Sequence, residues 1–223
     1  MSQIIVIGGS DQGRQVVDAI VARGFHTVVG VLDRALARGD VVAGVPVLGS
    51  DDDLAACAAE VGADEFVVAI GDNATRGRIL DRELAAAPHL QAATIVHPAA
   101  VVGHGAKLHA GSILLAGAVV GNGTTVERGV LLGIHSSIDH DGFVAHFASL
   151  GPGATIGGTV RIGHDTAIGL GANVVHGVTI GEDTVVGAGA LVLDDLPSSV
   201  VAYGVPAKVA RSRQHGEPYL TNG

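Results

Sequence analysis

The stretch Val119–Ile138, VVGNGTTVERGVLLGIHSSI, decides the fold of this chain. Within it an aliphatic residue returns at every sixth position, at Val120, Val126, Leu132 and Ile138. The same phase continues in both directions, from Val96 to Val192, and gives seventeen hexads without a miss. A fixed six-residue period is typical of a parallel β-helix with a triangular coil, in which each hexad forms one side. The sequence therefore predicts an all-β parallel β-helix over residues 92–196.

The positions around each aliphatic are also restricted. The residue two places earlier is always small or Val, as at Ala118 and Thr124, and Gly follows the aliphatic directly in nine hexads, as at Gly121. We expect the small residue to let the chain pass the corner, and Gly to supply turn dihedrals that are closed to other residues. Seventeen hexads make nearly six coils, so the prism is predicted to be about 27 Å tall.

Residues 1–91 follow a different pattern, in which short apolar runs alternate with amphipathic ones. Strands that alternate with helices indicate a small parallel sheet of the βαβ, Rossmann-like type. The chain is thus predicted to have an α/β domain over 1–91, the β-helix over 92–196 and a C-terminal loop and tail over 197–223. The expected strands are Gln3–Gly8, Thr27–Leu32, Val45–Leu48 and Phe66–Ile70, and the expected helices are Arg14–Arg23, Asp51–Glu60 and Asn73–Ala87.

Composition narrows the range of functions. The 223 residues carry a net charge of −9 and show no long basic stripe, which argues against nucleic acid as a partner. The single Cys57 cannot form an internal disulfide, and the first residues enter a strand-like run directly. No apolar stretch reaches the roughly 20 residues that a bilayer span needs. We therefore expect a cytoplasmic protein with no membrane partner.

The segment Val185–Arg211, which ends with the Gly204–Lys208 turn GVPAK, resembles the usual ending of the hexapeptide-repeat acyltransferases. The α/β domain in front narrows the resemblance to the branch that includes the NeuD-like sialic-acid O-acetyltransferases and the PglD-like N-acetyltransferases. This resemblance implies a left-handed β-helix and a homotrimer with acyl-CoA bound between neighbouring prisms. It also implies acetyl-CoA as co-substrate, a CoA loop within residues 197–223, a nucleotide-linked sugar as acceptor, and no metal.

The motif Ser136–Asp141, SSIDHD, is the main candidate for chemistry. A neutral imidazole can accept a proton near pH 7, so His140 is the candidate general base. A neighbouring carboxylate would fix its tautomer. The resemblance assigns this role to Asp141, whereas chemistry alone leaves Asp139 as an equal candidate. The resemblance also places the backbone N–H of Gly158 at the oxyanion of the tetrahedral intermediate.

The resemblance implies acyl-CoA contacts at Ser149, Leu170 and Ala188, the last through its backbone. Ser149 departs from the pattern, because relatives often have His at this position. A basic group near the C-terminus could meet the CoA phosphates or form an ordinary solvated tail, and it consists of Lys208, Arg211 and Arg213.

The Gly-rich stretch Gly8–Gly13 lies between an expected strand and an expected helix, where free backbone N–H groups and the helix dipole favour a phosphate. Asp33 ends the second expected strand and could accept from a ribose or base. By resemblance, the sugar nucleotide is bound by Ser10, Asp11, Gln12, Asp33, Arg34 and Gly71. Asp11-Gln12 replaces the Gly-His that is usual in relatives, which leaves the acceptor open.

Three alternatives remain from the sequence. A γ-type carbonic anhydrase shares the prism and binds zinc through three histidines, for which His104, His135 and His140 are candidates. The α/β domain and the GVPAK ending count against this alternative. The second is a non-catalytic sugar-nucleotide-binding or scaffold protein. The third is O-acylation of a sugar, although N-acylation of an amino sugar is favoured.

Overall fold

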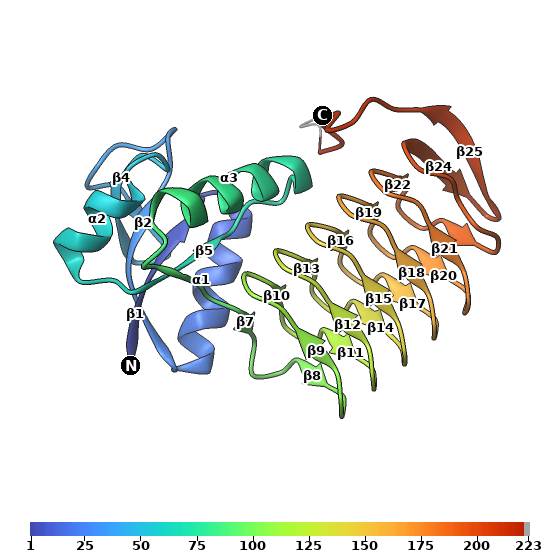
Figure 1. The fold of residues 1–223 in the computed structure, drawn as a ribbon, viewed down its shortest axis with the longest axis horizontal. Helices are drawn as coiled ribbons and strands as arrows, with labels where there is room; N and C mark the ends of the chain where they lie inside the picture. The colour runs from blue at the N-terminus through green and yellow to red at the C-terminus, as the bar shows by residue number, and fades with distance from the viewer. Residues whose placement is uncertain (221–223) are drawn as a thin grey trace.

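A computed structural model describes residues 1–220 and shows two regions, an α/β domain and a parallel β-helix (Figure 1). The sheet of the α/β domain has the strand order β3-β4-β2-β1-β5-β6, and all its neighbours are parallel except β3 and β4. Its strands are β1 (Ser2–Ile7), β2 (His26–Leu32), β3 (Val41–Val42), β4 (Val45–Gly49), β5 (Glu65–Val68) and β6 (Gln91–Ala92). Its helices are α1 (Asp11–Arg23), α2 (Leu54–Val61) and α3 (Asn73–Ala86).

The predicted elements of this domain are all present, with small differences at their ends. The α2 helix starts at Leu54 instead of Asp51, because Asp51 is buried and its carboxylate binds Arg34 outside the helix. The short strands β3 and β6 were not predicted. Gly13 closes the first βα turn tightly, since a Cβ at this residue would lie 2.0 Å from the carbonyl oxygen of Gly8.

The β-helix consists of three stacked parallel sheets, which we call faces 1, 2 and 3 of the prism. Each strand pairs with the strand three hexads later, as Leu114 does with Leu132. Face 1 contains β7 (Ile95–Val96), β10 (Ile113–Leu114), β13 (Leu131–Leu132), β16 (Ser149–Leu150), β19 (Ala167–Ile168), β22 (Val185–Val186), β24 (Val200–Gly204) and the antiparallel β25 (Ala207–Ser212).

Faces 2 and 3 complete each coil. Face 2 contains β8 (Val101–Val102), β11 (Val119–Val120), β14 (Ser137–Ile138), β17 (Thr155–Ile156), β20 (Asn173–Val174) and β23 (Leu191–Val192). Face 3 contains β9 (Lys107–Leu108), β12 (Thr125–Val126), β15 (Phe143–Val144), β18 (Arg161–Ile162) and β21 (Thr179–Ile180). The chain turns at corners 1–2, 2–3 and 3–1, named after the faces they join. The predicted α/β and parallel β-helix architectures are therefore confirmed.

The two small positions of the hexad serve purposes other than those we expected. The residue two places before each aliphatic points into the prism, because Ala118 and Thr124 are fully buried in its interior. The Gly after the aliphatic does not have a positive φ. It is needed where the next coil comes close, since a Cβ at Gly121 would lie 2.5 Å from the carbonyl carbon of Asp139. Positive φ occurs two residues later, as at Gly123 and Asp141.

The α/β domain packs on the outer side of face 1 over the first three coils. Outward-pointing Ile95, Ile113 and Leu131 are buried in one hydrophobic cluster with Val16 and Ile20 of α1. This packing covers only part of face 1, and the later coils remain free to form a cleft. Within residues 1–220, no helix combines the length and the apolar character needed to span a bilayer.

Candidate active site

His140 lies at corner 2–3, where the chain passes from β14 to β15. Its Nδ1 is 3.0 Å from Oδ2 of Asp141, while its backbone N–H donates to Oδ1 of Asp139 at 2.8 Å. The hydrogen bond to Asp141, followed by the charge of Asp139, raises the pKa of His140 above its usual value. The sequence left both Asp139 and Asp141 as candidates to orient the imidazole, and in the structure the carboxylate of Asp141 contacts the ring. The left-handed φ of 54° at Asp141 places its side chain there.

The other ring nitrogen of His140 is free. Its Nε2 has no hydrogen-bond partner within residues 1–220, and the side chain is more than half exposed. With Asp141 accepting from Nδ1–H, the tautomer leaves Nε2 as the basic nitrogen. This imidazole is therefore able to accept a proton from a ligand.

Gly158 lies one coil along the prism from His140, at the same corner. A Cβ at Gly158 would lie 2.5 Å from Nε2 of His140, so any side chain there would displace the imidazole. In the described part of the chain, the backbone N–H of Gly158 has no acceptor. The corner thus presents a base and an unused N–H donor next to each other.

Ser149, Leu170 and Ala188 line one cleft, of about 370 Å³, between face 1 and the α/β domain. Leu170 and Ala188 lie at corner 1–2, and Ser149 lies on the outer side of β16. The lining is mainly apolar, and Leu170 leaves 60% of its surface exposed there. Lys208 lies elsewhere, exposed on β25, and does not line the cleft.

The opposite wall of this cleft belongs to the α/β domain. It includes Gln12 and Gln15 of α1 and Gly71, which follows β5. Nε2 of Gln12 is buried and has no hydrogen-bond partner within residues 1–220, which is uncommon for a buried polar atom. Gln15 was missed in the sequence, although its spacing of three residues from Gln12 puts both on one side of the helix.

A second hollow, of about 210 Å³, lies at the carboxyl ends of β1, β2 and β5. Asp33 is held there by the N–H groups of Gly9, at 2.7 Å, and Ala35, at 2.8 Å. The Nε and Nη2 of Arg34 donate to both oxygens of Asp51, and this contact lowers the pKa of Asp51. Thr75 and Arg78 of α3 also line the hollow and were not predicted.

Ser10 and Asp11 stand at the start of α1. Ser10 is the N-cap residue, and its side chain makes no capping hydrogen bond. Asp11 is exposed and its carboxylate forms an ion pair with Arg14 of the same helix. The candidate acceptor residues therefore surround the first βα turn and extend to Gly71.

The predicted residues form two groups in one chain. Ser149, Leu170 and Ala188 share a cleft with Gln12 and Gly71, whereas His140 and Gly158 lie at a different corner of the prism. The corners are separated by the width of face 2, which is on the order of 15 Å for a five-residue extended segment. A single chain does not bring the candidate base to the cleft.

A second histidine cluster at corner 3–1 was not predicted. His146 and His164 stack with their ring centroids 4.9 Å apart. Both nitrogens of His164 contact carboxylates, Nδ1 to Asp165 at 2.9 Å and Nε2 to Glu182 at 2.8 Å. Burial opposes the charged form, but these contacts outweigh it and raise the pKa of His164. With both nitrogens engaged, His164 lacks the free Nε2 that distinguishes His140.

Among residues 1–220 no group of three or more His, Cys, Asp or Glu side chains is arranged to hold a metal ion. His104, His135 and His140, the zinc candidates of the carbonic anhydrase alternative, are not gathered into such a group within one chain. In the sequence, the spacing of His135 and His140 was compatible with metal binding, so spacing alone could not exclude this alternative.

Comparisons with known proteins found one matching family model and several similar structures. Residues 3–82 match the family model described as the PglD N-terminal domain. A histidine-to-alanine mutant of GDP-perosamine N-acetyltransferase from Caulobacter crescentus, solved with CoA and GDP-perosamine, is 34% identical, with a TM-score of 0.88 over 95% of this chain and 98% of that one. No curated protein matches.

Two further solved structures share the whole architecture. The acetyltransferase domain of PglB from Neisseria gonorrhoeae, in complex with acetyl coenzyme A, is 31% identical, with a TM-score of 0.87 over 93% of this chain and 98% of that one. WeeI from Acinetobacter baumannii is 24% identical, with a TM-score of 0.83 over 94% of this chain and 100% of that one, which shows a shared fold.

Proposed function

The chain belongs to the left-handed β-helix, hexapeptide-repeat sugar acetyltransferases of the PglD-like branch, and we propose that it transfers an acetyl group from acetyl-CoA to the amine of a nucleotide-linked amino sugar. It is an acetyl-CoA-dependent sugar N-acetyltransferase, as the sequence predicted. The observation that carries the choice of substrates is the cleft, which has Ser149 and Leu170 on one wall and Gln12 and Gly71 on the other.

The acceptor proposal follows from the α/β domain. Its hollow lies at the carboxyl ends of parallel strands and includes the charged side chains of Asp33, Arg34 and Arg78. This edge is the usual place for a nucleotide in an open α/β sheet. The GDP-perosamine complex of the Caulobacter enzyme supports an amino sugar joined to a nucleoside diphosphate. We assign residues 1–91 to the sugar nucleotide, 92–196 to acyl transfer and 197–223 to the cofactor side.

The mechanism is direct attack of the sugar amine on the thioester. As nitrogen bonds to the carbonyl carbon, Nε2 of His140 takes the amine proton, and Asp141 stabilises the imidazolium. The N–H of Gly158 stabilises the oxyanion of the tetrahedral intermediate. When this collapses, the carbon–sulfur bond breaks, the proton passes from His140 to the CoA thiolate, and the amide and free CoA leave.

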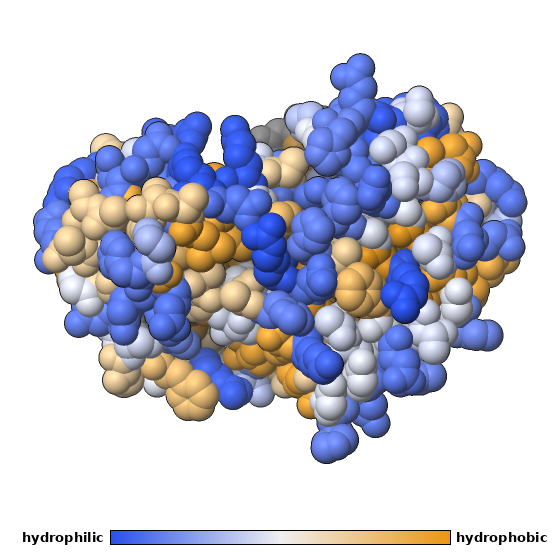
Figure 2. Space-filling view, viewed as in Figure 1, coloured by the Kyte–Doolittle hydropathy of each residue, from blue (hydrophilic) through white to orange (hydrophobic). Residues whose placement is uncertain are grey.

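A homotrimer would bring the two groups of residues together. Face 2 has six outward residues and none is charged, while face 1 is partly covered and face 3 carries Lys107 and Arg161. Val101 is 58% and Val119 37% exposed on face 2. Hydrophobic residues also reach the surface of the β-helix half among polar side chains (Figure 2). Apolar surface of this kind fits an interface with further copies.

A closed threefold arrangement about face 2 has a specific consequence. The two edges of face 2 are corner 1–2 and corner 2–3, so corner 1–2 of one copy meets corner 2–3 of the next. Leu170 and Ala188 of one subunit would then face His140 and Gly158 of its neighbour. The trimer proposal is supported by this pairing, which makes three sites from three incomplete chains.

The proposal is tested by incubating the protein with acetyl-CoA and a panel of nucleotide-linked amino sugars, with mass spectrometry of the products. We expect a mass gain of one acetyl group on at least one amino sugar. Matched sugar nucleotides with a hydroxyl in place of the amine are the control. Acetylation of the hydroxyl compounds alone would replace N-transfer with O-transfer, and no product with any acceptor would contradict the proposal.

Both substrates are products of cytoplasmic metabolism, which supports the cytoplasm as the place of action.

A further inference from the structure

The chain beyond β25 turns back over face 1 and runs toward α3 (Figure 1). It is anchored by Arg213, whose Nη1 contacts Oδ1 of Asp183 at 2.9 Å. Both side chains are only 3% exposed, and the N–H of Arg213 donates to the carbonyl of Ser199 at 2.8 Å. Breaking such a buried pair leaves an unpaired charge and is costly, so the anchor holds the tail in place.

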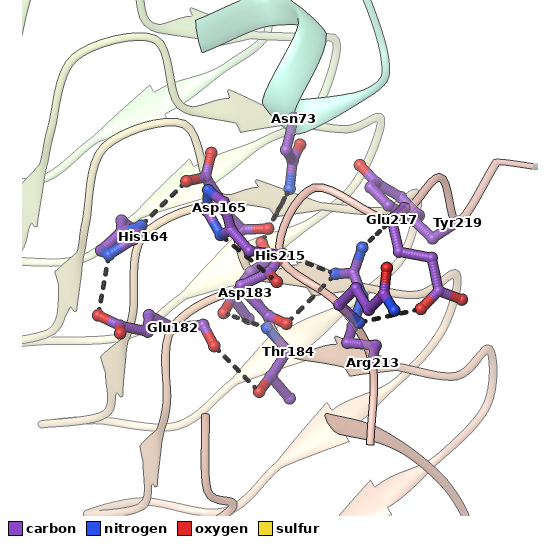
Figure 3. A network of polar contacts seen from close by, with 12 residues as sticks. Asn73, His164, Asp165, Glu182, Asp183, Thr184, Arg213, His215, Glu217 and Tyr219 are labelled. Carbon is purple, nitrogen blue, oxygen red and sulfur yellow. Dashed lines mark hydrogen bonds and ion pairs between the residues drawn. The ribbon is translucent and has the colours of Figure 1, made fainter. Parts of the chain in front are cut away.

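A tight turn follows the anchor (Figure 3). The N–H of Gln214 donates to Oε2 of Glu217 at 3.1 Å, and the N–H of Glu217 donates back to the carbonyl of Gln214 at 3.0 Å. Arg211 binds the Glu217 carboxylate at 2.8 Å, and this hydrogen bond lowers the pKa of Glu217. The direction of the chain is thereby fixed immediately before Tyr219.

Tyr219 lies between the two sides of the cleft, one formed by the β-helix and the other by the α/β domain. Its hydroxyl donates to the carbonyl oxygen of Gly71 at 3.1 Å and lies 3.4 Å from Oγ of Ser149. Burial raises the pKa of Tyr219, so the hydroxyl stays protonated as a donor at neutral pH. Gly71 belongs to the proposed acceptor side and Ser149 to the proposed acyl-CoA side. One hydroxyl therefore connects the two sides of the cleft.

The cleft stays open with the tail in place. Its volume of about 370 Å³ is bounded by Tyr219 and Leu220 as well as by Leu170 and Ala188. Leu220 is more than half exposed and lies against Gly71, where a Cβ would be 3.1 Å from its Cδ1. The tail is thus a wall of the cleft, and a ligand can lie between Leu220 and Leu170.

We propose that the tail completes the acyl-CoA site. Tyr219 is a positioning residue that holds Ser149 against the Gly71 loop, and Leu220 contacts bound acyl-CoA. This inference rests on the proposed function, because it takes the cleft to be the acyl-CoA site. The resemblance assigned a CoA loop to residues 197–223 as a whole but did not single out Tyr219 or Leu220, because QHGEPYL (Gln214–Leu220) shows neither hexad spacing nor helical periodicity.

Two truncated chains test whether Tyr219 and Leu220, the tail residues that line the cleft, contribute to CoA binding. A chain cut after Pro218 keeps Arg213 and Glu217 but loses the wall, and a chain cut after Leu220 keeps the wall. CoA binding to each is measured by titration calorimetry without acceptor. We expect the cut after Pro218 to weaken binding by about tenfold or more, and the cut after Leu220 to bind as the full chain does.

Each other outcome has a defined meaning. Equal CoA binding by both truncated chains would contradict the proposal that Tyr219 and Leu220 form part of the acyl-CoA site. Tighter binding by the chain cut after Pro218 would also contradict it, because the tail would then compete with CoA. If the full chain itself does not bind CoA, the proposed function fails, and the inference fails with it. Binding by the full chain with no effect of the cut after Pro218 would remove the inference alone.

Point variants test the positioning role. Tyr219→Phe should raise the KM for acetyl-CoA by about fivefold with kcat changed less than about twofold, because only ground-state binding is lost. Tyr203→Phe, the same change at the exposed second tyrosine of the chain, should change neither. Leu220→Ala should act like Tyr219→Phe, and Val21→Ala, at an exposed aliphatic side chain of α1 outside the cleft, is its control.

A double-mutant cycle with Ser149→Ala then tests the contact itself. If Tyr219 acts through Ser149, the double variant should bind CoA no more weakly than about the weaker single variant. Independent, additive losses would show that Tyr219 does not position Ser149. If Tyr219→Phe lowers both kcat and the melting temperature but leaves the KM for acetyl-CoA unchanged, the residue serves folding alone. This result would overturn the positioning role.

Discussion

His140 differs from the neighbouring histidines in its contacts, although His146 also has an Nε2 without a hydrogen-bond partner within residues 1–220. His164 has carboxylates on both nitrogens, and His146 is bound by Glu127 and stacked on His164. A base needs an accessible lone pair within reach of the substrate proton. Among these three histidines, only His140 places its unpartnered Nε2 beside Gly158, whose backbone N–H has no acceptor within residues 1–220.

Replacing His140 by Ala should lower kcat by about 10²–10⁴-fold, the usual range for loss of a positioned general base. The KM for acetyl-CoA should hardly change, because the imidazole is not proposed to bind CoA. Steady-state kinetics with an amino-sugar acceptor measures both constants. His146→Ala is the control and should keep near-normal turnover. Normal turnover in His140→Ala together with its loss in His146→Ala would mean that the wrong base was chosen.

The pH dependence should report the carboxylates beside His140. The base acts in its neutral form, so kcat/KM rises with pH through the pKa of His140. Asp141 and Asp139 both raise this pKa. Asp141→Asn removes the hydrogen bond and a charge, so the pKa should fall and the acidic limb should move to lower pH. Asp139→Asn should move it less, and a larger shift in Asp139→Asn would reverse the assignment.

At the residue scale, the sequence predicted which residues form the candidate site but not the contacts that each of them makes. The motif pointed to His140, but the choice between Asp139 and Asp141 depends on a left-handed turn residue that sequence spacing does not specify. Gly158 was expected for its N–H alone, whereas the ring of His140 also excludes any side chain there. A local backbone angle decides the first detail, and a contact between successive coils, which joins residues three hexads apart, decides the second.

At the scale of elements, the first βα turn and the end of β2 form the acceptor side. Asp33→Asn keeps the size of the side chain but removes the charge that binds the N–H groups of Gly9 and Ala35. We expect the KM for the sugar nucleotide to rise by about fivefold or more, with the KM for acetyl-CoA unchanged. Asp64→Asn is the control, since Asp64 accepts from Gln3 at the opposite end of β1. An equal loss of CoA affinity would assign the α/β domain another role.

The α3 helix is attached to the β-helix by Arg76, which is almost fully buried and has no carboxylate partner within residues 1–220. Its guanidinium donates to the carbonyls of Gly129, at 2.7 Å, and Phe147, at 2.6 Å, and burial lowers its pKa. Arg76→Ala leaves these carbonyls unpaired and opens a cavity. The free energy of unfolding in urea should fall by about 3 kcal/mol or more.

The matched control is Arg128→Ala, at the same boundary between the two regions. Arg128 forms an ion pair with Asp81 of α3, but both side chains are about half exposed. Its loss should cost about 1 kcal/mol or less, as for other exposed pairs. Equal destabilisation by both variants would show that burial of Arg76 does not fix the domain contact.

The hexads predicted every strand from β7 to β23, because each of the seventeen aliphatics ends one of them. They did not predict β24 and β25, which extend face 1 into the region expected to be a loop and tail. They did not predict where the α/β domain packs, although a signal was present. The residues one place before the aliphatics point outward, and Ile95, Ile113 and Leu131 are large and apolar on three successive coils of one face. Comparing residues three hexads apart would have shown this surface.

At the scale of the whole molecule, the assembly decides whether the enzyme has a complete site. Light scattering at micromolar concentration should give the mass of three chains. Val119→Asp places a charge on β11 of face 2, whose outward residues are uncharged, and should shift the protein toward monomers, because burying an unpaired carboxylate is costly. Thr125→Asp on the neighbouring face 3 is the control and should stay trimeric. A monomer mass for the unchanged chain would contradict the proposed interface.

A shared site also predicts complementation between two inactive variants. His140→Ala lacks the base at corner 2–3, and Leu170→Arg blocks the cleft at corner 1–2, where Leu170 is exposed enough to be changed without unfolding. Refolded together in equal amounts, the two chains form mixed trimers. A site is intact where corner 2–3 of a Leu170→Arg chain meets corner 1–2 of a His140→Ala chain, so about a quarter of the wild-type activity should return. If base and cleft belonged to one chain, every site in the mixture would carry one of the two changes and no activity would return. Mixing the folded trimers without unfolding is the control, and it should stay inactive for as long as the subunits do not exchange.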